Sequence, residues 1–246
     1  MRGYGQFCPV AKAAEIFAER WTPLVLRELL CGSVHFSELH RGVPLMSRSL
    51  LSLRLKQLEE MGVVRRKQGQ QGPEYHLTQA GQEFAPIVQS LGEWGHRWVR
   101  TKFGRDESDV TLLMWDMRRS VKPSEFPSGR FSVQFDFSDQ PASKRHWWLV
   151  GDDQEVDLCP TNPGFDVGLY VTTDLRTMTR VWMGDLTLKT AINSGAIELD
   201  GTRDLRQRFE RWLGLSGFAG VKDMRRSMGA ASNRVRSEDT GLRRPI

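Results

Sequence analysis

The feature that most constrains the fold is a helix pattern that runs directly into a hairpin pattern, between residues 47 and 77. Ser47 is a favourable N-cap residue, and leucines at helical spacing follow it. These leucines are Leu51, Leu55 and Leu58. Two apolar-ended segments, residues 63–67 and 74–77, then flank a tip rich in Gly and Gln. The pattern predicts a helix with one buried face and, after Gly62, an antiparallel two-stranded ribbon.

Helical patterns surround this pair of elements. Residues 10–18 carry apolar side chains at helical spacing, Pro23 suits the first turn of a second helix, and residues 36–41 form a short third one. Thr78 should cap a long helix to Val99, with Pro86 either kinking it or lying near its first turns. This order of elements is that of a winged helix-turn-helix, a mostly α domain that we assign to residues 1–104.

In such a fold, the helix after Ser47 presents its outer face to the major groove of DNA, and the ribbon reaches a neighbouring groove or its phosphates. The backbone N–H groups at the start of the helix also favour a phosphate. A solvated strand is the alternative interpretation of the ribbon's cations. The candidate DNA contacts are Ser37, Ser47, Arg48, Ser49, Ser52, Leu53, Arg54, Lys56, Arg65, Arg66, Lys67 and Gln70.

The charge is distributed unevenly along the chain. The net charge of +5 combines +5 over residues 1–103, −3 over residues 104–222 and +3 over residues 223–246. A basic N-terminal part suggests an acidic partner, with double-stranded DNA as the first candidate and ordinary surface charge as the alternative. Residues 223–246 are rich in Arg, Ser and Gly, which predicts a basic disordered tail.

Eight short segments follow one another between residue 4 and about residue 100: Cys8–Ala13, Glu19–Thr22, Leu26–Leu29, Phe36–Leu39, Ser47–Leu55, Glu59–Val64, Tyr75–Gly81 and Leu91–Trp94. Taken together, these segments resemble the HxlR-type winged-helix transcription regulators. The family implies a homodimer that uses the first and last helices of the domain and binds paired half-sites. Two positions depart from the family pattern. Leu53 stands where a polar residue, often Gln, is expected, and Arg48 stands where the family often has Pro.

Residues 105–222 mix strand and helix patterns without regular βαβ alternation, which favours an α+β domain. The clearest strand is residues 131–137, and further strands are expected at 146–150, 167–171 and 197–199. Five segments within about residues 108–215 carry a looser resemblance: Trp148–Val150, Val156–Cys159, Val171–Asp174, Trp182–Asp185 and Gly195–Ile197. They resemble the SCP2-like sterol-carrier fold, which implies an apolar cavity for a hydrophobic small molecule. Aromatic residues either line that cavity or form plain core. The candidate lining residues are Phe135, Phe137, Trp148, Tyr170 and Trp182.

Cysteine and histidine give weaker signals. Cys8 occupies a position where several family members carry a redox-sensing cysteine, and a buried packing residue is the alternative. The spacing of Cys31, His35 and His40 matches no zinc module, so we expect no metal and no cofactor. We find no phosphate loop, HExxH motif or nucleophile elbow, so we do not expect an enzyme.

The apolar runs are shorter than the roughly 18 residues of a membrane span, and no secretory signal opens the chain, so we expect a cytoplasmic protein. The favoured hypothesis is a homodimeric, sequence-specific DNA-binding transcription regulator whose C-terminal domain either binds a hydrophobic effector or mediates an interaction. The alternative is a lipid or small-molecule carrier whose helical domain only dimerises. An enzyme in the second domain would need a polar catalytic cluster in the cavity.

Overall fold

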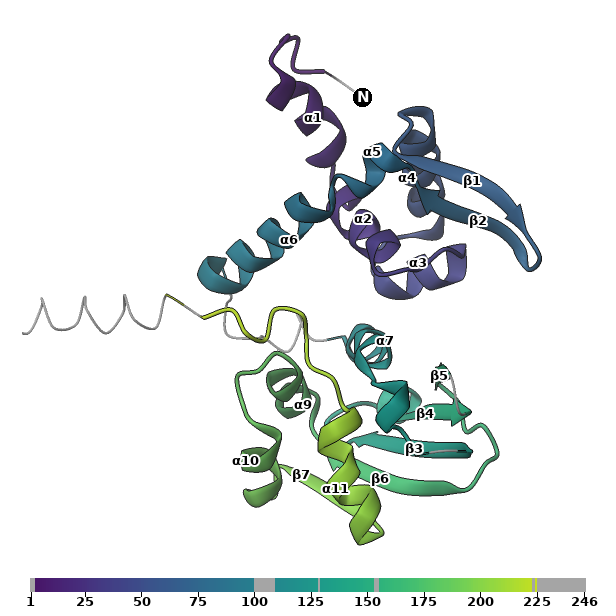
Figure 1. Ribbon diagram of the computed structural model, residues 1–246, viewed down its shortest axis with the longest axis vertical. Coiled ribbons are helices and arrows are strands. Elements are labelled where there is room, and N and C mark those ends of the chain that lie inside the picture. The colour runs from purple at the N-terminus through teal and green to yellow at the C-terminus, as the bar shows by residue number, and fades with distance from the viewer. Residues whose placement is uncertain (1–2, 100–108, 128, 153–154, 223, 225–246) are drawn as a thin grey trace, which may run out of the picture.

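The computed structural model describes residues 3–99, 109–127, 129–152, 155–222 and 224. They form two bodies with separate hydrophobic cores, and Figure 1 shows helix α7 (Val110–Ser120) of the second body lying toward the first. The first body contains α1 (Pro9–Phe17), α2 (Thr22–Leu30), α3 (Phe36–Gly42), α4 (Arg48–Glu60), β1 (Val64–Gly69), β2 (Gly72–Leu77), α5 (Gln79–Gln82), α6 (Ala85–Trp94) and the π-helical turn η1 (Gly95–Val99).

The leucine stripe of α4 anchors the first core, as the sequence predicts. Leu51, Leu55 and Leu58 are 0–1% exposed and pack in one cluster with Leu26 of α2 and Leu39 of α3. Burial of three leucines on one face leaves the opposite face of α4 outside the core. The helix-turn-helix pair α3–α4 is therefore held by hydrophobic packing that does not involve the outer surface of α4.

The ribbon β1–β2 is attached to the helices through the segment before α3. The two strands are antiparallel, with Val64 opposite Leu77 and Lys67 opposite Glu74. On its other side, β2 meets the residues before α3, because the Tyr75 N–H donates to the Val34 carbonyl at 2.8 Å. The ribbon therefore has a defined position relative to α3 and α4, and its tip extends away from the body (Figure 1).

The expected long helix after Thr78 is divided, because α5 ends at Gln82 and α6 begins at Ala85, from where it continues directly into η1. Pro86 lies at the start of α6, where its missing N–H costs no helical hydrogen bond. The placement of Pro86 in the first turn is confirmed, whereas the single continuous helix is wrong. Among the described residues, no helix is long and apolar enough to cross a membrane.

The second body is built on a five-stranded mixed sheet in the order β5-β4-β3-β6-β7, in which β3 and β6 are parallel and the other neighbours antiparallel. Besides α7, its elements are η3 (Pro123–Glu125), β3 (Arg130–Phe137), α8 (Ala142–Arg145), β4 (His146–Asp152), β5 (Glu155–Cys159), β6 (Val167–Thr173), α9 (Leu175–Trp182), α10 (Leu188–Asn193), β7 (Ile197–Gly201) and α11 (Arg203–Trp212).

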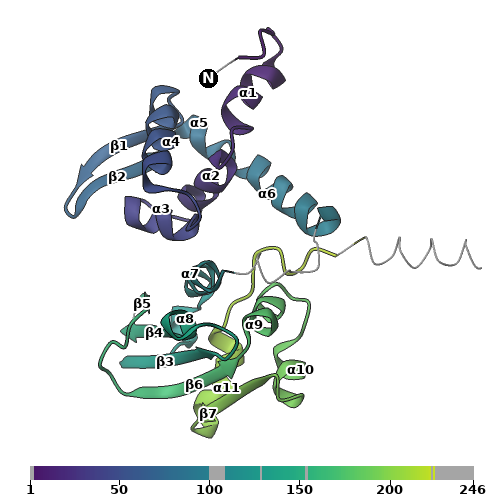
Figure 2. The same cartoon turned by 180° about the vertical axis from the view of Figure 1, so that it is seen from behind.

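Helix α11 lies against one face of this sheet, in front of β3 and β6 in Figure 1 and behind them in Figure 2. Its Phe209 and Trp212 are buried in the core with Phe135 and Phe137 of β3. The α+β class is as expected, but α8 and the edge strand β5 lie outside the segments that the sequence predicts. The expected domain junction at residues 104–105 and the expected tail, except Met224, lie outside the described residues.

Candidate nucleic-acid interface

The outer face of α4 is polar at its start and carries one exposed leucine in its middle. The Ser47 hydroxyl accepts a hydrogen bond from the Leu50 N–H at 3.3 Å, so Ser47 is the N-cap that the sequence predicts. The side chains exposed along this face are Arg48, Ser49, Ser52, Leu53 and Lys56. Leu53 is 51% exposed, so it is available to contact an apolar group such as a thymine methyl.

Arg54 does not belong to this exposed surface, and its inclusion among the candidate contacts is corrected. It is 7% exposed, and its guanidinium donates to the Glu19 carboxylate at 3.2 Å and to the Gln57 side-chain carbonyl at 2.9 Å. The physical reason is helical geometry. Arg54 lies beside the buried Leu55 and only three positions from Leu51, so its side chain turns toward the loop that precedes α2.

The ribbon presents three cations that have no acidic partner among the described residues. Arg65, Arg66 and Lys67 are exposed, and among the residues that the structure describes none of them lies within 4 Å of a carboxylate. Gln70 is exposed at the tip, and Ser37 is exposed at the start of α3. Unpaired cations beside an exposed helix face form a surface that can neutralise phosphates.

Comparison with known proteins assigns this first body. A family model described as HxlR-like helix-turn-helix matches residues 16–103. The chain is 39% identical over 102 residues to the HTH-type transcriptional regulator YvaP of Bacillus subtilis, covering 94% of that protein and 40% of this chain. The chain belongs to the HxlR-like helix-turn-helix family.

Two further similarities to this HxlR-like chain are of comparable extent. An HTH-type transcriptional regulator of Methanothermobacter thermautotrophicus is 35% identical over 91 residues, which are 36% of this chain and 70% of that protein. The reduced form of the transcriptional regulator YodB from B. subtilis is similar at 27% identity with a TM-score of 0.34, over 38% of this chain and 95% of that one. The HxlR-like family model itself ends at residue 103, before the second body begins.

A buried carboxylate joins the two bodies, and the sequence patterns do not single it out. Glu28 of α2 is fully buried, and it accepts hydrogen bonds from Arg27 at 2.7 Å and from the Trp115 indole N–H at 3.2 Å. Arg119 of α7 lies 3.1 Å from the same carboxylate. The sequence signal that could have identified Glu28 is the presence of a charged residue within the apolar helix of residues 22–30. Glu28 therefore links the helix-turn-helix directly to the second body.

The end of α3 packs against the Glu28 carboxylate and its partners, which together we call the Glu28 joint. A side chain at Gly42 would overlap the Glu28 carboxylate, and the Gly42 carbonyl accepts a hydrogen bond from Arg27 at 2.8 Å. Arg119 also pairs with Asp116 one turn earlier in α7. Burial raises the pKa of Asp116, although the nearby guanidinium groups of Arg27 and Arg119 act in the opposite direction. The joint thus contains alternating charges with little access to water.

The five aromatic residues expected to line a cavity are absent from the linings of three cavities in the described part of the chain. Phe135 and Phe137 are fully buried in the core, and Trp148 is 7% exposed on the opposite side of the sheet, because side chains alternate along β3 and β4. Tyr170 is 42% exposed, and Trp182 is half-buried at the end of α9. A role for these five residues in lining a cavity stays a prediction.

Two expectations concern cysteine and metal. Cys8 is half-buried and precedes the first residue of α1, where its carbonyl accepts a hydrogen bond from the Lys12 N–H at 3.1 Å. Cys31 is exposed as a residue, but the protein atoms around its thiol partly desolvate that group, which raises the pKa of Cys31. Within the described part of the chain, no group of three His, Cys, Asp or Glu side chains is arranged to hold a metal ion.

In the described structure, no residue of helix α1 or helix α6 is buried. Both carry apolar residues at helical spacing, which normally indicates a face that packs against something. The exposed apolar side chains on and beside these helices are Phe7, Val10, Ile87, Leu91, Trp94, Trp98 and Val99. Phe7 is 99% exposed and Trp94 is 56% exposed. Each of the two helices therefore leaves apolar side chains exposed that a binding partner could cover.

Proposed function

We propose that this HxlR-like chain is a sequence-specific DNA-binding transcription regulator. The observation that carries the proposal is the exposed outer face of α4 beside a ribbon whose Arg65, Arg66 and Lys67 have no carboxylate within reach in the described chain. Helix α4 enters the major groove, with Ser49, Ser52, Leu53 and Lys56 toward the base edges and Arg48 at a phosphate.

The proposed DNA complex contains two copies of the chain. The apolar side chains of α1 and α6 support this, because burial of Phe7, Leu91 and Trp94 between two copies removes exposed apolar area from water. A twofold axis then presents two α4 helices to successive major grooves. Light scattering of the full chain should give twice the monomer mass, and Trp94→Glu should shift the mass toward the monomer.

DNA binding is tested by fluorescence anisotropy with a duplex taken from the DNA upstream of the chain's own gene, at several salt concentrations. The triple variant Arg65/Arg66/Lys67→Ala should bind more weakly, and the slope of log affinity against log salt should fall by about 0.9 for each phosphate that the variant no longer neutralises. The matched control removes three exposed cations from the second body, Arg176/Lys189/Arg208→Ala, and should leave that slope unchanged. Equal affinities for the wild type and the ribbon variant would refute the proposal.

The second body is proposed to bind a hydrophobic effector that changes DNA affinity. Its support is a set of cavities of about 410–460 Å³, which fall in the range of small-molecule pockets. An effector can switch the regulator only by binding DNA-competent and DNA-incompetent forms with different affinities. We further propose that this body has the SCP2-like fold, which its helix-covered mixed sheet supports. We also propose that the protein is located in the cytoplasm.

A carrier whose helical domain only dimerises is the alternative, and the same cavities favour it. Native mass spectrometry of freshly purified protein separates the two functions when it is combined with the DNA titration. A tightly held apolar ligand without any DNA binding would establish the carrier. We propose no catalytic reaction for either body.

Cys8 is proposed as an oxidant-sensing thiol, supported by its position just before α1 and by the incomplete burial of its side chain. Treatment with hydrogen peroxide should lower DNA affinity in the wild type and in Cys31→Ser, but not in Cys8→Ser. An identical response of Cys8→Ser would leave Cys8 as a packing residue at the dimer helix.

A further inference from the structure

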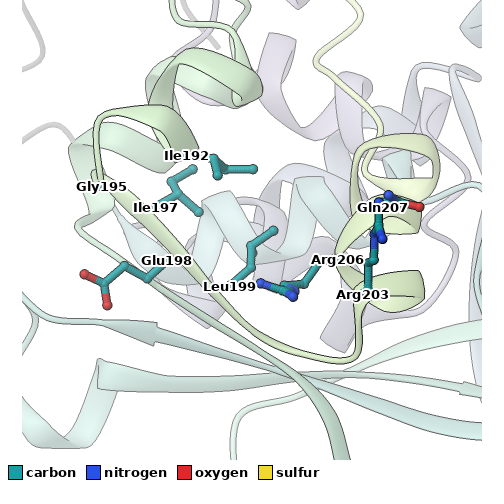
Figure 3. Close-up of a pocket in the computed structure, with 8 residues that line it drawn as sticks. All are labelled: Ile192, Gly195, Ile197, Glu198, Leu199, Arg203, Arg206 and Gln207. Atoms are coloured by element: carbon teal, nitrogen blue, oxygen red, sulfur yellow. The ribbon is translucent and has the colours of Figure 1, made fainter.

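A groove at the edge of the second body combines an apolar floor with a cationic rim. It lies between α10, β7 and α11 and encloses about 450 Å³. Figure 3 shows the residues that line it, which are Ile192, Gly195, Ile197, Glu198, Leu199, Arg203, Arg206 and Gln207. Its volume is that of a site for a small organic molecule.

The floor of the groove is apolar because of strand alternation. Ile197 and Leu199 are two positions apart in β7 and point to the same side, where Ile192 of α10 meets them (Figure 3). Glu198 lies between them in sequence and points away from the groove (Figure 3). The one carboxylate in the lining is thus directed elsewhere, and the floor offers only hydrocarbon surface.

The rim carries two guanidinium groups without an anionic partner in the part of the chain that the structure describes. Arg203 and Arg206 are exposed on α11, and Arg206 extends toward Leu199 (Figure 3). In the described chain neither has a carboxylate within 4 Å, whereas Arg208 of the same helix pairs with Asp204 at 3.1 Å. A guanidinium offers two parallel N–H donors that match a carboxylate. The rim is therefore suited to an anion.

A neighbouring cavity of the second body has a different charge in its lining. A cavity of about 460 Å³ between α9, α10 and the residues after α11 is also largely apolar, but Glu210 is its only ionisable lining residue. It would repel an anionic head group. The charge of the lining therefore distinguishes the two cavities by ligand class.

We propose that the groove between β7 and α11 binds an aliphatic carboxylate, with the chain on Ile192, Ile197 and Leu199 and the carboxylate on Arg206 and Arg203. The inference rests on the proposed function of the second body as the effector-binding part. It goes further by naming the ligand class and the site.

Isothermal titration calorimetry of the full chain tests the ligand class with hexanoate, octanoate and decanoate below their micelle concentrations. Affinity should rise by about fourfold for each methylene that the floor buries. Octanoate should bind at least about tenfold more tightly than 1-octanol or octylammonium, because only the anion gains charge-assisted hydrogen bonds. Equal binding of the three octyl compounds, or no binding of any carboxylate, would overturn the proposal.

Variants of α11 test the site. Arg206→Gln should weaken octanoate binding by about tenfold, whereas Arg208→Gln, with the same loss of charge on the same helix, should change it by less than about twofold. Equal losses in both variants would show a general charge effect and overturn the assignment.

The outcome is separable from that of the proposed function because no DNA is present in this assay. Octanoate binding that depends on Arg206 but leaves DNA affinity unchanged would keep the site and refute effector control. DNA binding without octanoate binding would refute the site and keep the regulator.

Discussion

Removal of the buried carboxylate that joins the two bodies should be unusually costly for a single substitution. In Glu28→Ala, the Trp115 indole N–H, in a residue that is 2% exposed, loses its acceptor. Arg27 and Arg119, with side chains 28% and 16% exposed, lose their shared counter-charge. Removal of one partner from a buried ion pair typically costs about 3–5 kcal/mol. Because both guanidinium groups keep some contact with water, we expect the lower end, about 3 kcal/mol.

The prediction is measured by urea unfolding, followed by tryptophan fluorescence and by circular dichroism. With a denaturant slope of about 2 kcal/mol per molar, the midpoint of the first transition should fall by about 1.5 M. The matched control is Glu60→Ala. Glu60 pairs with Lys56 at 3.8 Å in a bridge whose side chains are 62% and 73% exposed, so its loss should cost at most about 0.5 kcal/mol. If both variants lose the same stability, Glu28 does not hold the joint.

Three further predictions concern the first body and the segment that packs on it. Leu51→Ala should lower the free energy of unfolding by about 3 kcal/mol, measured in urea, because Leu51 is fully buried. Hydrogen bonds from Lys12 and the Tyr4 N–H lower the pKa of Glu15, so the Tyr4 amide shift in NMR should titrate below the ordinary range of a glutamate. The hydrogen bonds to Glu15 contribute their full stability at a pH above the ordinary pKa range of a glutamate. This contribution is lost as the pH falls through the lowered pKa of Glu15. A side chain at Gly92 would meet the Phe218 ring, so Gly92→Val should increase the hydrogen exchange of residues 214–222, and unchanged exchange would contradict this packing.

The elements that the sequence predicts best are those whose signal is local. The Ser47 cap and the leucine stripe of α4 are specified within a few turns of one helix, and the structure retains both. The alternation of β3 is equally local. Strand β5 is short, carries Glu155 and Asp157, and forms the edge of the sheet, so it has little periodic apolar pattern to recognise.

The remaining discrepancies depend on tertiary contacts. Arg54 lies next to the exposed face of α4 in any helical projection, and only the position of Glu19 shows that its guanidinium is held inside. Likewise, the aromatic residues of β3 could line a cavity or fill a core until Phe209 and Trp212 of α11 are seen packed in the same cluster. The Glu28 joint involves residues almost ninety positions apart, which no local pattern can connect.

The arrangement of contacts gives effector control a physical route. Helix α11, which carries the rim of the groove, ends at Trp212, whose carbonyl accepts a hydrogen bond from the Lys122 N–H just after α7. Helix α7 carries Arg119, which binds Glu28 in the helix-turn-helix body. Continuity of contacts does not by itself establish energetic coupling, which must be measured. If the coupling passes through Glu28, Glu28→Gln should still bind octanoate and DNA separately. The factor by which each ligand changes the affinity of the other, which is reciprocal by linkage, should approach one.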